Sequence, residues 1–416
     1  MSRLWEKGQG LDEKILQFTV GRDHELDHRL IPYDVRASQA HAKMLGEVGL
    51  LSPADTEAIC NGLEEVLNQW RAGSFHIDLR QEDCHTAIEE ELVAQLGPVG
   101  ERVHLGRSRN DQVLVALRLY LKDAIGHVQL LLQQCVLQLE KLSTKQGTIA
   151  IPGYTHLQQA MPSSVSDWAL GWRSVLLDST VLLDAALQTL DQNPLGSAAG
   201  YGTPGLKLDR AMTSDELGFR EVQIPSTACQ SSRGKGESFF AFALLSVLTD
   251  LGRLSADVCF LATQEVGLVK LDEDVSTGSS IMPHKRNPDV FELIRGHASV
   301  AKGEFEAILA ITSKLTSGYH RDYQLIKEPL FSLIDRGMKT IEIATYALGR
   351  IHFVPGRFES IADPGLFSAE EAFRMVQEEG IPFREAYRRV AARMKARGAH
   401  GRCRCYPADR YNKSRV

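Results

Sequence analysis

Cysteine is scarce in this chain, and the few cysteines present follow no pattern. Seven occur among 416 residues, an odd number at irregular intervals. Secreted disulfide-rich domains carry closely spaced cysteines, usually in even number. The sequence therefore indicates reduced thiols in a cytosolic protein. Cys403 and Cys405 form a C-x-C pair without the further ligands that a zinc site requires.

Long apolar runs and an excess of one charge are also missing. The longest uncharged apolar stretch, residues 238–249, is much shorter than the roughly 20 residues of a membrane span. The N-terminal residues MSRLWEKGQGLDEK carry charges where a signal peptide needs an apolar run. A net charge of −6 provides no basic field for nucleic acid or anionic lipid. We expect a soluble, cytoplasmic protein that binds neither nucleic acid nor membranes.

Strand alternation and β-hairpin signals are weak in the middle of the chain, where helical periodicity is strong instead. An apolar stripe with spacings of three and four covers residues 113–142. Similar stretches cover 163–191, 240–261, 287–311 and 327–348. In the fourth stretch, Asn287 is expected as N-cap and Pro288 as the first helical residue. Helices of roughly thirty residues would be about 45 Å long, which predicts a rod-like, all-α bundle.

The composition divides the chain into three predicted domains. Residues 1–105 hold shorter helices interrupted by glycine and proline, and 106–353 form the central bundle of long helices. Residues 354–416 form a small C-terminal helical segment with a loose basic tail. The surplus of leucine at 130–132 predicts a second buried surface on the bundle, which we interpret as a subunit interface.

Three polar segments interrupt the long helices. GRSRNDQ, residues 106–112, places two arginines at a helix N-terminus, where they favour an anion between them. Alternatively, both arginines pair with nearby carboxylates such as Asp111. PGYTHLQ, residues 152–158, contains one histidine in a turn, and such a histidine is more often a surface residue than a catalyst.

The third segment, TGSSIMPHKRNPD at 277–289, leads directly into a helix N-terminus. Backbone N–H groups, the helix dipole and Lys285 would together favour an anion there. A phosphate-binding loop or a flexible linker are the alternatives. No Walker pattern occurs, because Leu206 follows the glycine-rich 196–205 stretch where a lysine is required. That stretch follows no predicted strand, which argues against a dinucleotide loop, and neither H-E-x-x-H nor clustered Cys and His suggests a metal.

The third segment, extended to TGSSIMPHKRNPDVFELIRG, closely resembles the signature loop of the fumarase/aspartase superfamily. Members of this superfamily eliminate fumarate from succinyl compounds. Together with GRSRNDQ and PGYTHLQ, in this order and spacing, the chain resembles the argininosuccinate lyase family from LWEKG to about Arg397. The resemblance implies β-elimination of argininosuccinate to arginine and fumarate in arginine biosynthesis. It also implies an all-α homotetramer whose active sites are shared among three subunits.

The resemblance assigns roles to individual residues. Ser279 would be the general base that removes the Cβ proton, and Lys285 would bind the carboxylate that takes up charge. His156, held by Glu292, would assist proton transfer and substrate binding. The residues that would bind substrate, or border its pocket, are Arg109, Asn110, Thr155, Asn287, Tyr319, Gln324, Lys327, Asp83 and His85. No cofactor is implied, because the leaving group is an already polarised guanidinium nitrogen.

The chain departs from the family pattern at two places near the pocket. Asp23 lies where the family uses a serine near the amino-acid end of the substrate. Residues 230–235, QSSRGK, replace an S-x-R-D pattern, with Arg233 as a possible equivalent of its arginine. Adenylosuccinate lyase or another fumarate-releasing lyase is the alternative function, because MPHKRNP also occurs among adenylosuccinate lyases. A catalytically inactive, crystallin-like structural protein is a remote one.

Overall fold

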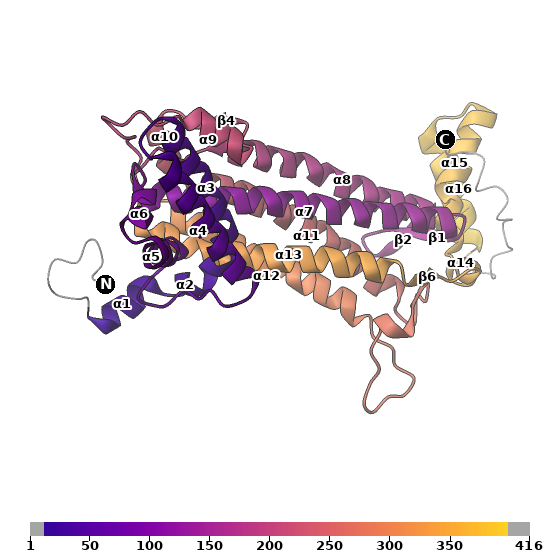
Figure 1. The fold of residues 1–416 in the computed structure, drawn as a ribbon. Helices are drawn as coiled ribbons and strands as arrows, with labels where there is room; N and C mark the ends of the chain where they lie inside the picture. Colours follow the sequence, from indigo (N-terminus) through magenta and orange to yellow (C-terminus); the bar gives the residue numbers. More distant parts are fainter. Residues whose placement is uncertain (1–11, 398–416) are drawn as a thin grey trace. The chain divides into compact units, whose positions relative to one another are not determined.

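The computed structural model describes residues 12–397, and most of them lie in helices (Figure 1). Five helices are long, from 22 to 38 residues: α7 (Arg109–Gln146), α8 (Val165–Leu190), α11 (Lys235–Leu261), α12 (Asp289–Thr312) and α13 (Lys327–Leu348). The prediction of long helices is confirmed. The LWEKG motif and the predicted basic tail after residue 397 lie outside the described residues.

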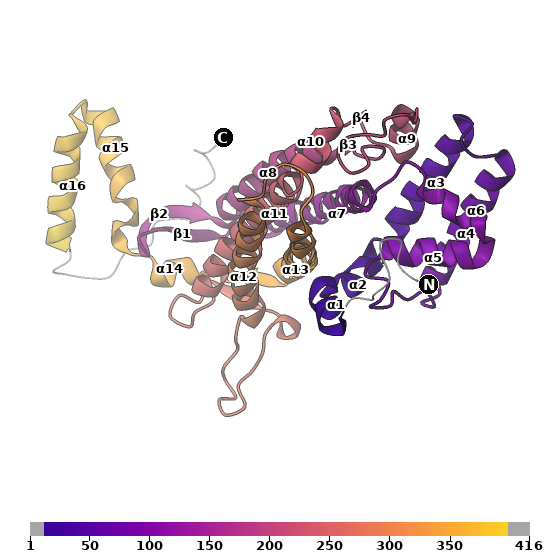
Figure 2. The same ribbon diagram turned by 90° about the vertical axis from the view of Figure 1, so that its left-hand side faces the viewer.

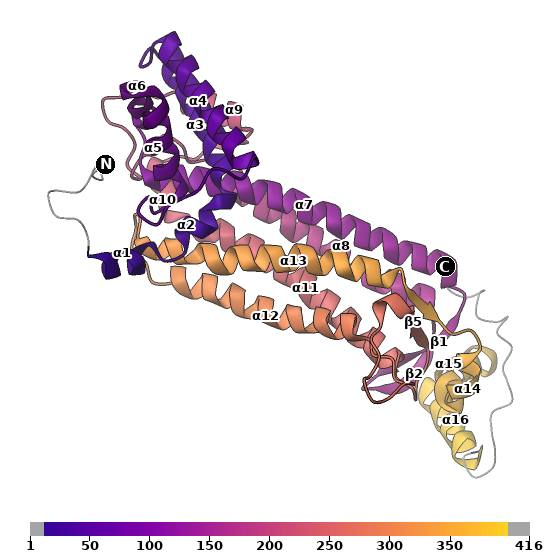
Figure 3. The same ribbon diagram turned by 60° about the horizontal axis from the view of Figure 1, so that its bottom comes forward.

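The chain forms two compact units, which we describe separately. Unit one takes its described residues from 12–129, 180–245 and 300–337, and unit two takes them from 130–179, 246–299 and 338–397. The boundaries between the units fall within the five long helices. In each unit the segments of these helices run side by side (Figure 3). Three domains divided near residues 105 and 353 stay a prediction.

Unit one adds short helices to its segments of the long ones. They are α1 (Glu13–Val20), α2 (Asp23–Leu26), η1 (Asp27–Arg29), α3 (Ile31–Glu47), α4 (Pro53–Arg71), α5 (Cys84–Leu96), α6 (Pro98–Glu101), η2 (Arg102–His104), α9 (Arg210–Leu217), α10 (Ser226–Ser231) and η4 (Arg321–Ile326). Helices α3 to α6 lie together (Figure 2). Ser52 caps α4 by accepting from the Asp55 N–H at 3.1 Å. Asp83 caps α5 in the same way through the Thr86 N–H at 2.9 Å, because helix N-termini leave such donors unsatisfied.

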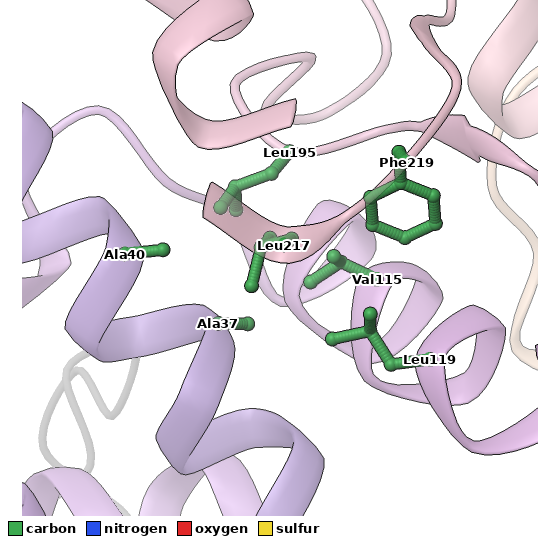
Figure 4. Close-up of a cluster of buried hydrophobic side chains, with 7 residues drawn as sticks. All are labelled: Ala37, Ala40, Val115, Leu119, Leu195, Leu217 and Phe219. Carbon is green, nitrogen blue, oxygen red and sulfur yellow. The ribbon is translucent and has the colours of Figure 1, made fainter. Parts of the chain in front are cut away.

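A buried apolar cluster joins α3, α7 and the loops around α9 within unit one (Figure 4). Its members, all at most 5% exposed, are Ala37, Ala40, Val115, Leu119, Leu195, Leu217 and Phe219. Two alanines on α3 face larger side chains from α7 and α9, so the helices can approach closely without leaving a void. Each large apolar side chain buried here contributes about 1.5–3 kcal/mol. The cluster therefore fixes the N-terminal part of α7 against α3.

Unit two contains a β-hairpin that the sequence prediction missed. Strands β1 (Ala150–Thr155) and β2 (Gln158–Ser164) pair antiparallel with a bulge at Gly153 and Tyr154. Its two-residue turn, His156 and Leu157, lacks the Asn-Gly signature of such turns. The first strand also contains Pro152, a residue that argues against a strand when only the sequence is considered. The all-α prediction is therefore corrected to mostly helical, with three short two-stranded sheets in the described chain.

The other two sheets are smaller. In unit one, β3 (Gln192–Asn193) pairs parallel with β4 (Glu221–Val222). In unit two, β5 (Val269–Leu271) pairs antiparallel with β6 (Ile351–Phe353). The remaining elements of unit two are η3 (Glu273–Val275), α14 (Arg357–Ile361), η5 (Pro364–Phe367), α15 (Ser368–Glu379) and α16 (Phe383–Arg397). Helices α15 and α16 form a helical hairpin (Figure 2).

The start of α12 differs from the predicted one. The helix begins at Asp289, and the Pro288 carbonyl accepts its first hydrogen bonds. Asn287 does not cap it, because its side-chain amide points to Thr277 Oγ1 and the Gly278 carbonyl, each at 3.5 Å. The expected capping residue therefore closes the preceding loop.

Helix α11 carries the most apolar stretch of the described chain. The 226–261 segment is long and apolar enough to cross a membrane, but 56% of its most apolar window is buried inside the protein. A core helix of a folded protein has this character. The leucines at 130–132 diverge in their environment, since Leu130 is 60% exposed whereas Leu132 is buried.

Candidate active site

A cavity of about 190 Å³ in unit one collects most of the predicted substrate-binding residues. Its lining comes from the start of α2, the loop before α5, the first turn of α7 and the segment around η4. The predicted residues among the lining are Asp83, His85, Arg109, Asn110, Tyr319, Gln324 and Lys327. Residues more than two hundred positions apart in the sequence thus meet around one polar space.

Arg109, the first residue of α7, is oriented by acidic neighbours. Its Nη1 lies 3.5 Å from Glu82 Oε2 and 3.5 Å from Asp83 Oδ2, and its Nη2 donates to Thr86 Oγ1 at 2.6 Å. The Arg109 side chain remains 41% exposed and lines the cavity, so it can still reach a ligand there. The alternative prediction, that the arginines pair with nearby carboxylates, therefore holds for Arg109. Its partners are Glu82 and Asp83, not Asp111.

Asp111 instead organises a glycine-containing turn. Its Oδ1 accepts from the Ser108 N–H, and its Oδ2 accepts from the N–H groups of Gly196 and Ala198, all at 2.9 Å. Burial raises the pKa of Asp111 to about 6, although these hydrogen bonds lower it. The carboxylate fixes the 196–202 segment against the N-terminus of α7.

His85 lines the cavity from a buried position, where it pairs with Asp34. Its Nδ1 is 2.8 Å from Asp34 Oδ2, and both side chains are almost fully buried. Burial alone would lower the pKa of His85, but the Asp34 charge and hydrogen bond raise it above its usual value. Burial likewise opposes ionisation of Asp83, yet the charges of His85 and Arg109 hold the pKa of Asp83 below its usual value. Asp83 therefore presents a carboxylate, and the charge of Asp34 favours the protonated form of His85.

Lys327 is the most deeply placed cation at this site. Its Nζ donates to Asp27 Oδ1 at 2.6 Å and to Asp23 Oδ2 at 3.0 Å. Although burial lowers the pKa of Lys327, the two carboxylates raise it well above its usual value. Burial raises the pKa of Asp23 to about 7, and the Asp27 charge adds to this while Lys327 opposes it. One ammonium thus serves two buried carboxylates.

Gln324 and Tyr319 border the same cavity with different freedom. The Gln324 amide donates to the carbonyls of Thr19 and Val20 at 3.0 and 2.8 Å, so it ties the end of α1 to η4. Tyr319 is 38% exposed, and its ring lies 5.3 Å from the buried Arg233 guanidinium. Gln324 therefore supports the wall of the cavity, whereas the Tyr319 side chain remains accessible.

Within residues 12–397, one group of side chains has the composition of a metal site: Asp27, Cys84 and His85. Their ligand atoms lie within 4.8 Å of one another, and all three are buried. However, Asp27 Oδ1 already accepts from the Lys327 ammonium, and His85 Nδ1 faces Asp34. A second cation beside Lys327 would meet strong repulsion. The donor set fits the lysine better than a metal ion.

The predicted catalytic serine lies in unit two, in the loop between β5 and α12. This loop extends away from the helices of its unit (Figures 1 and 2). Its two ends are joined because Thr277 and Asn287 exchange backbone hydrogen bonds of 3.3 and 2.8 Å. Ser279 Oγ accepts from the N–H groups of Ile281 and Met282 at 3.3 and 3.1 Å. Lys285 follows within the same loop and is exposed.

His156 and Thr155 occupy the tip of the β1–β2 hairpin in unit two. Both side chains are exposed, and His156 and Leu157 have φ values of +54° and +59°. The ring of Tyr154 packs edge-on against Phe260 at 4.9 Å and anchors the hairpin. In the described part of this single chain, no hydrogen bond or ion pair joins His156 to Glu292, which is exposed in the first turn of α12.

Sequence reasoning did not name four charged residues of this region: Glu82 and Arg321, which line the cavity, and Asp27 and Asp34, which pair with the lining residues Lys327 and His85. Glu82 Oε2 lies 3.4 Å from Arg321 Nη2 as well as 3.5 Å from Arg109 Nη1. Glu82 also has a φ of +69°, which is uncommon outside glycine. Each of the four pairs with an oppositely charged residue that the sequence analysis had named, or with another of the four. Opposite charges on distant segments were therefore the signal by which these residues could have been found.

Comparisons with known proteins agree along most of the chain. The family model described as "Lyase" matches residues 15–303. The argininosuccinate lyase of Thermotoga neapolitana is 40% identical over 389 residues, which cover 94% of this chain and 97% of that protein. The argininosuccinate lyase of Xanthomonas oryzae is 41% identical and is matched over 93% of this chain and 90% of its own length.

Two solved structures are also similar to this chain over most of its length. A crystal structure of EDDS lyase in complex with formate is 25% identical, with a TM-score of 0.79, and the match covers 94% of this chain and 77% of that one. A fumarate lyase:delta crystallin from Brucella melitensis, bound to cobalt, is 18% identical with a TM-score of 0.76, over 90% of this chain and 85% of that one. The second similarity concerns the fold alone.

Proposed function

Because the chain belongs to the argininosuccinate lyase family of carbon–nitrogen lyases, we propose that it cleaves argininosuccinate into arginine and fumarate. The reaction would be a β-elimination that needs no cofactor. It would serve arginine biosynthesis in the cytoplasm, where the unpaired cysteines would stay reduced. The observation that carries the proposal is the environment of Ser279, whose Oγ accepts two backbone N–H groups in a loop that also contains Lys285.

Ser279 would act as the general base. A serine hydroxyl is a poor base in water, but the two N–H donors would stabilise its alkoxide, and Lys285 would add to this once the loop closes around substrate. The alkoxide would take the proton from the carbon next to the carboxylate that accumulates charge. Lys285 and Asn287 would bind that carboxylate as the carbanion forms, because fixed positive and polar groups lower the barrier most where charge develops.

The carbon–nitrogen bond would then break with its electron pair moving to the guanidinium nitrogen. The electron pair of the carbanion forms the double bond of fumarate, and the nitrogen takes a proton and leaves as arginine. His156, oriented by Glu292, would assist this proton transfer. Balance requires one proton removed from carbon and one delivered to nitrogen, so the reaction consumes no oxidant, reductant or water.

The cavity in unit one would hold the amino-acid end of the substrate. Arg109 and Asn110 would bind carboxylate groups there, and Tyr319 and Lys327 would complete the pocket with Gln324. Thr155 of a neighbouring chain would add a further contact to the substrate. The support is chemical, since the cavity combines exposed cationic and amide donors with carboxylates that a zwitterionic ligand can pair. Asp83 and His85 would keep Arg109 in position.

We propose that the active enzyme is a homotetramer in which neighbouring chains complete each site. Large apolar side chains stay exposed along the long helices: Leu130, Phe239, Phe242, Leu293, Val300 and Leu309. Exposed apolar side chains of this size on helices favour burial against further copies. Moreover, His156 and Glu292 do not pair within the described residues of one chain, so a partner chain is the natural source of the second group.

The test is to supply argininosuccinate and adenylosuccinate separately and to follow fumarate by its ultraviolet absorbance. Release from argininosuccinate alone is the expected result. Release from adenylosuccinate alone would overturn the substrate assignment in favour of the sister lyase. A chain that releases fumarate from neither, even in a single turnover, would be a structural homologue that has lost the chemistry.

A further inference from the structure

Asp23 begins α2 and lines the cavity, yet it uses only half of its hydrogen-bonding capacity. Its Oδ2 accepts from Lys327 Nζ at 3.0 Å, and its Oδ1 has no hydrogen-bond partner among the described residues. The side chain is 12% exposed, and that exposure is toward the cavity that it lines. Because Asp23 lines the cavity, this acceptor oxygen can receive a hydrogen bond from a ligand bound there. A hydrogen-bond donor on a bound ligand would therefore complete the hydrogen bonding of Asp23.

The other two carboxylates of the cavity lining already have cationic partners. Glu82 lies within 3.5 Å of two guanidinium groups, from Arg109 and Arg321, and Asp83 lies 3.5 Å from Arg109. Asp23 shares its single cation, Lys327, with the fully buried Asp27. When both aspartates are ionised, this group carries one negative charge in excess. That excess is what a cationic group of a ligand would neutralise.

We propose that Asp23 is the residue that recognises the ammonium group at the amino-acid end of the substrate. This rests on the proposed function, in which the substrate carries an α-ammonium and an α-carboxylate at that end. Arg109 and Asn110 suit the carboxylate, and Asp23 is the lining carboxylate with an oxygen left to accept from the ammonium. The family pattern has a serine at this place, and an ionised acceptor forms a hydrogen bond roughly twice as strong as a neutral one.

The inference is tested with three ligands that separate the two charges. Arginine carries both groups, agmatine carries the amine without the carboxylate, and 5-guanidinopentanoate carries the carboxylate without the amine. Binding is measured by calorimetry on the full-length protein, which requires no turnover. The Asp23→Asn variant should bind arginine and agmatine roughly ten- to a hundredfold more weakly, while its affinity for 5-guanidinopentanoate should change less than about threefold.

Asp27→Asn is the matched control, because Asp27 holds the same lysine and does not line the cavity. Asp27→Asn should weaken the binding of all three ligands to a similar extent, because it disturbs Lys327. If Asp23→Asn also weakens the three alike, Asp23 acts only by positioning Lys327, and the inference is wrong. The inference is equally wrong if the wild-type protein and Asp23→Asn bind agmatine with the same affinity.

Two further measurements keep the result interpretable. Melting temperatures establish that Asp23→Asn folds, and Asp23→Ser, which restores the family residue, replaces it if it does not. Fumarate release from argininosuccinate by the wild-type protein tests the proposed function independently. A wild type that binds agmatine through Asp23 but releases no fumarate would retain the inference about the subsite and refute the activity.

Discussion

The cavity of unit one and the loop and hairpin of unit two differ in how far a single chain completes them. Around the cavity, charged groups meet partners at 2.6–3.5 Å, and Lys327, Asp27 and His85 are buried. In unit two, Lys285, His156 and Glu292 are exposed, and Ser279 is held by hydrogen bonds from its own loop. A single chain therefore completes the polar contacts around the cavity, whereas the residues predicted to be catalytic in unit two remain exposed.

The difference has a physical origin. A buried charge must find its partner during folding, since an unpaired one costs several kcal/mol. We therefore expect the walls of the cavity to be in place before any ligand arrives. A loop whose two ends are joined to each other at Thr277 and Asn287 can instead close around substrate and exclude water at little cost. We infer that binding geometry is fixed by the fold and that catalytic geometry is assembled later.

The largest expected effect comes from the loop. Ser279→Ala should reduce kcat by about 10²–10⁴-fold with little change in folding or substrate binding, because only the transition state uses the alkoxide. Steady-state kinetics of fumarate release measure it. Ser280→Ala is the control, since the neighbouring hydroxyl is exposed and has no assigned role. A Ser279→Ala enzyme that keeps more than about a tenth of wild-type kcat would exclude Ser279 as the base.

The next largest effect should fall on unit one and on stability. Asp27→Ala leaves Lys327 with one carboxylate in a buried site, so the free energy of unfolding should fall by about 3–5 kcal/mol. Asp335→Ala is the control, because Asp335 is 59% exposed and pairs with Arg29 at 3.0 Å, which is worth about 0–1 kcal/mol. Chemical denaturation compares the two. Equal losses would contradict the view that the binding region depends on buried pairing.

The structure confirms the helical part of the sequence prediction and corrects its details. Periodic apolar stripes predicted all five long helices, because burial of one face dictates that spacing. The hairpin was missed since its turn residues, His156 and Leu157, are unusual for the φ values that they adopt. The predicted cap role of Asn287 is wrong, because a cap would accept through its side-chain oxygen, whereas the Asn287 amide nitrogen donates to Thr277 Oγ1 and the Gly278 carbonyl. The three predicted domains stay a prediction.

The candidate site was accessible to sequence reasoning only where motifs carried it. Lys327 was named from a motif, whereas its partner Asp27 lies 300 positions away and carries no local signal. Asp23 was noticed as a departure from the family pattern, and its contact with Lys327 could not be anticipated. Ion pairs between distant segments depend on the fold, so periodicity does not reveal them. The catalytic roles themselves stay predictions.

The affinity for agmatine is expected to rise about ninefold between pH 6 and pH 8, because Asp23 ionises in this range. Burial raises the pKa of this carboxyl to about 7, and Lys327, Asp27 and Asp83 are the charged groups around it. The ionised fraction then rises from about a tenth at pH 6 to about nine tenths at pH 8. Because the ionised form accepts from an ammonium, agmatine should bind up to about nine times more tightly at pH 8. Calorimetry at both values should show no such change for Asp23→Asn.

Assembly should produce a roughly fourfold effect. Inactive His156→Asn and Ser279→Ala chains, denatured together and refolded, should regain activity if one site takes these residues from different chains. Random assortment leaves about a quarter of the sites with both residues intact. Each variant refolded alone should stay inactive. Mixed tetramers that form but remain as inactive as their parents would mean that one chain supplies both groups.

The smallest effect concerns the hairpin tip in unit two. Leu157 has a φ of +59°, which costs a leucine about 1–2 kcal/mol, whereas asparagine tolerates this conformation. Its side chain is 74% exposed, so Leu157→Asn loses little packing within the chain. The variant should therefore be more stable by up to about 1 kcal/mol, with activity unchanged. Leu170→Asn on α8, 43% exposed, is the control and should be destabilising, because asparagine is a poorer helix former.

Thermal unfolding and hydrogen exchange of the hairpin amides measure the sign of this difference. A stabilised Leu157→Asn protein would show that the tip is strained and unpaired even in the assembled enzyme. If Leu157→Asn instead lowers the melting temperature as much as Leu170→Asn, the leucine is buried in the assembly by another chain. The exposed tip would then be a contact that holds His156 in place, and the apparent incompleteness of unit two would belong to the isolated chain alone.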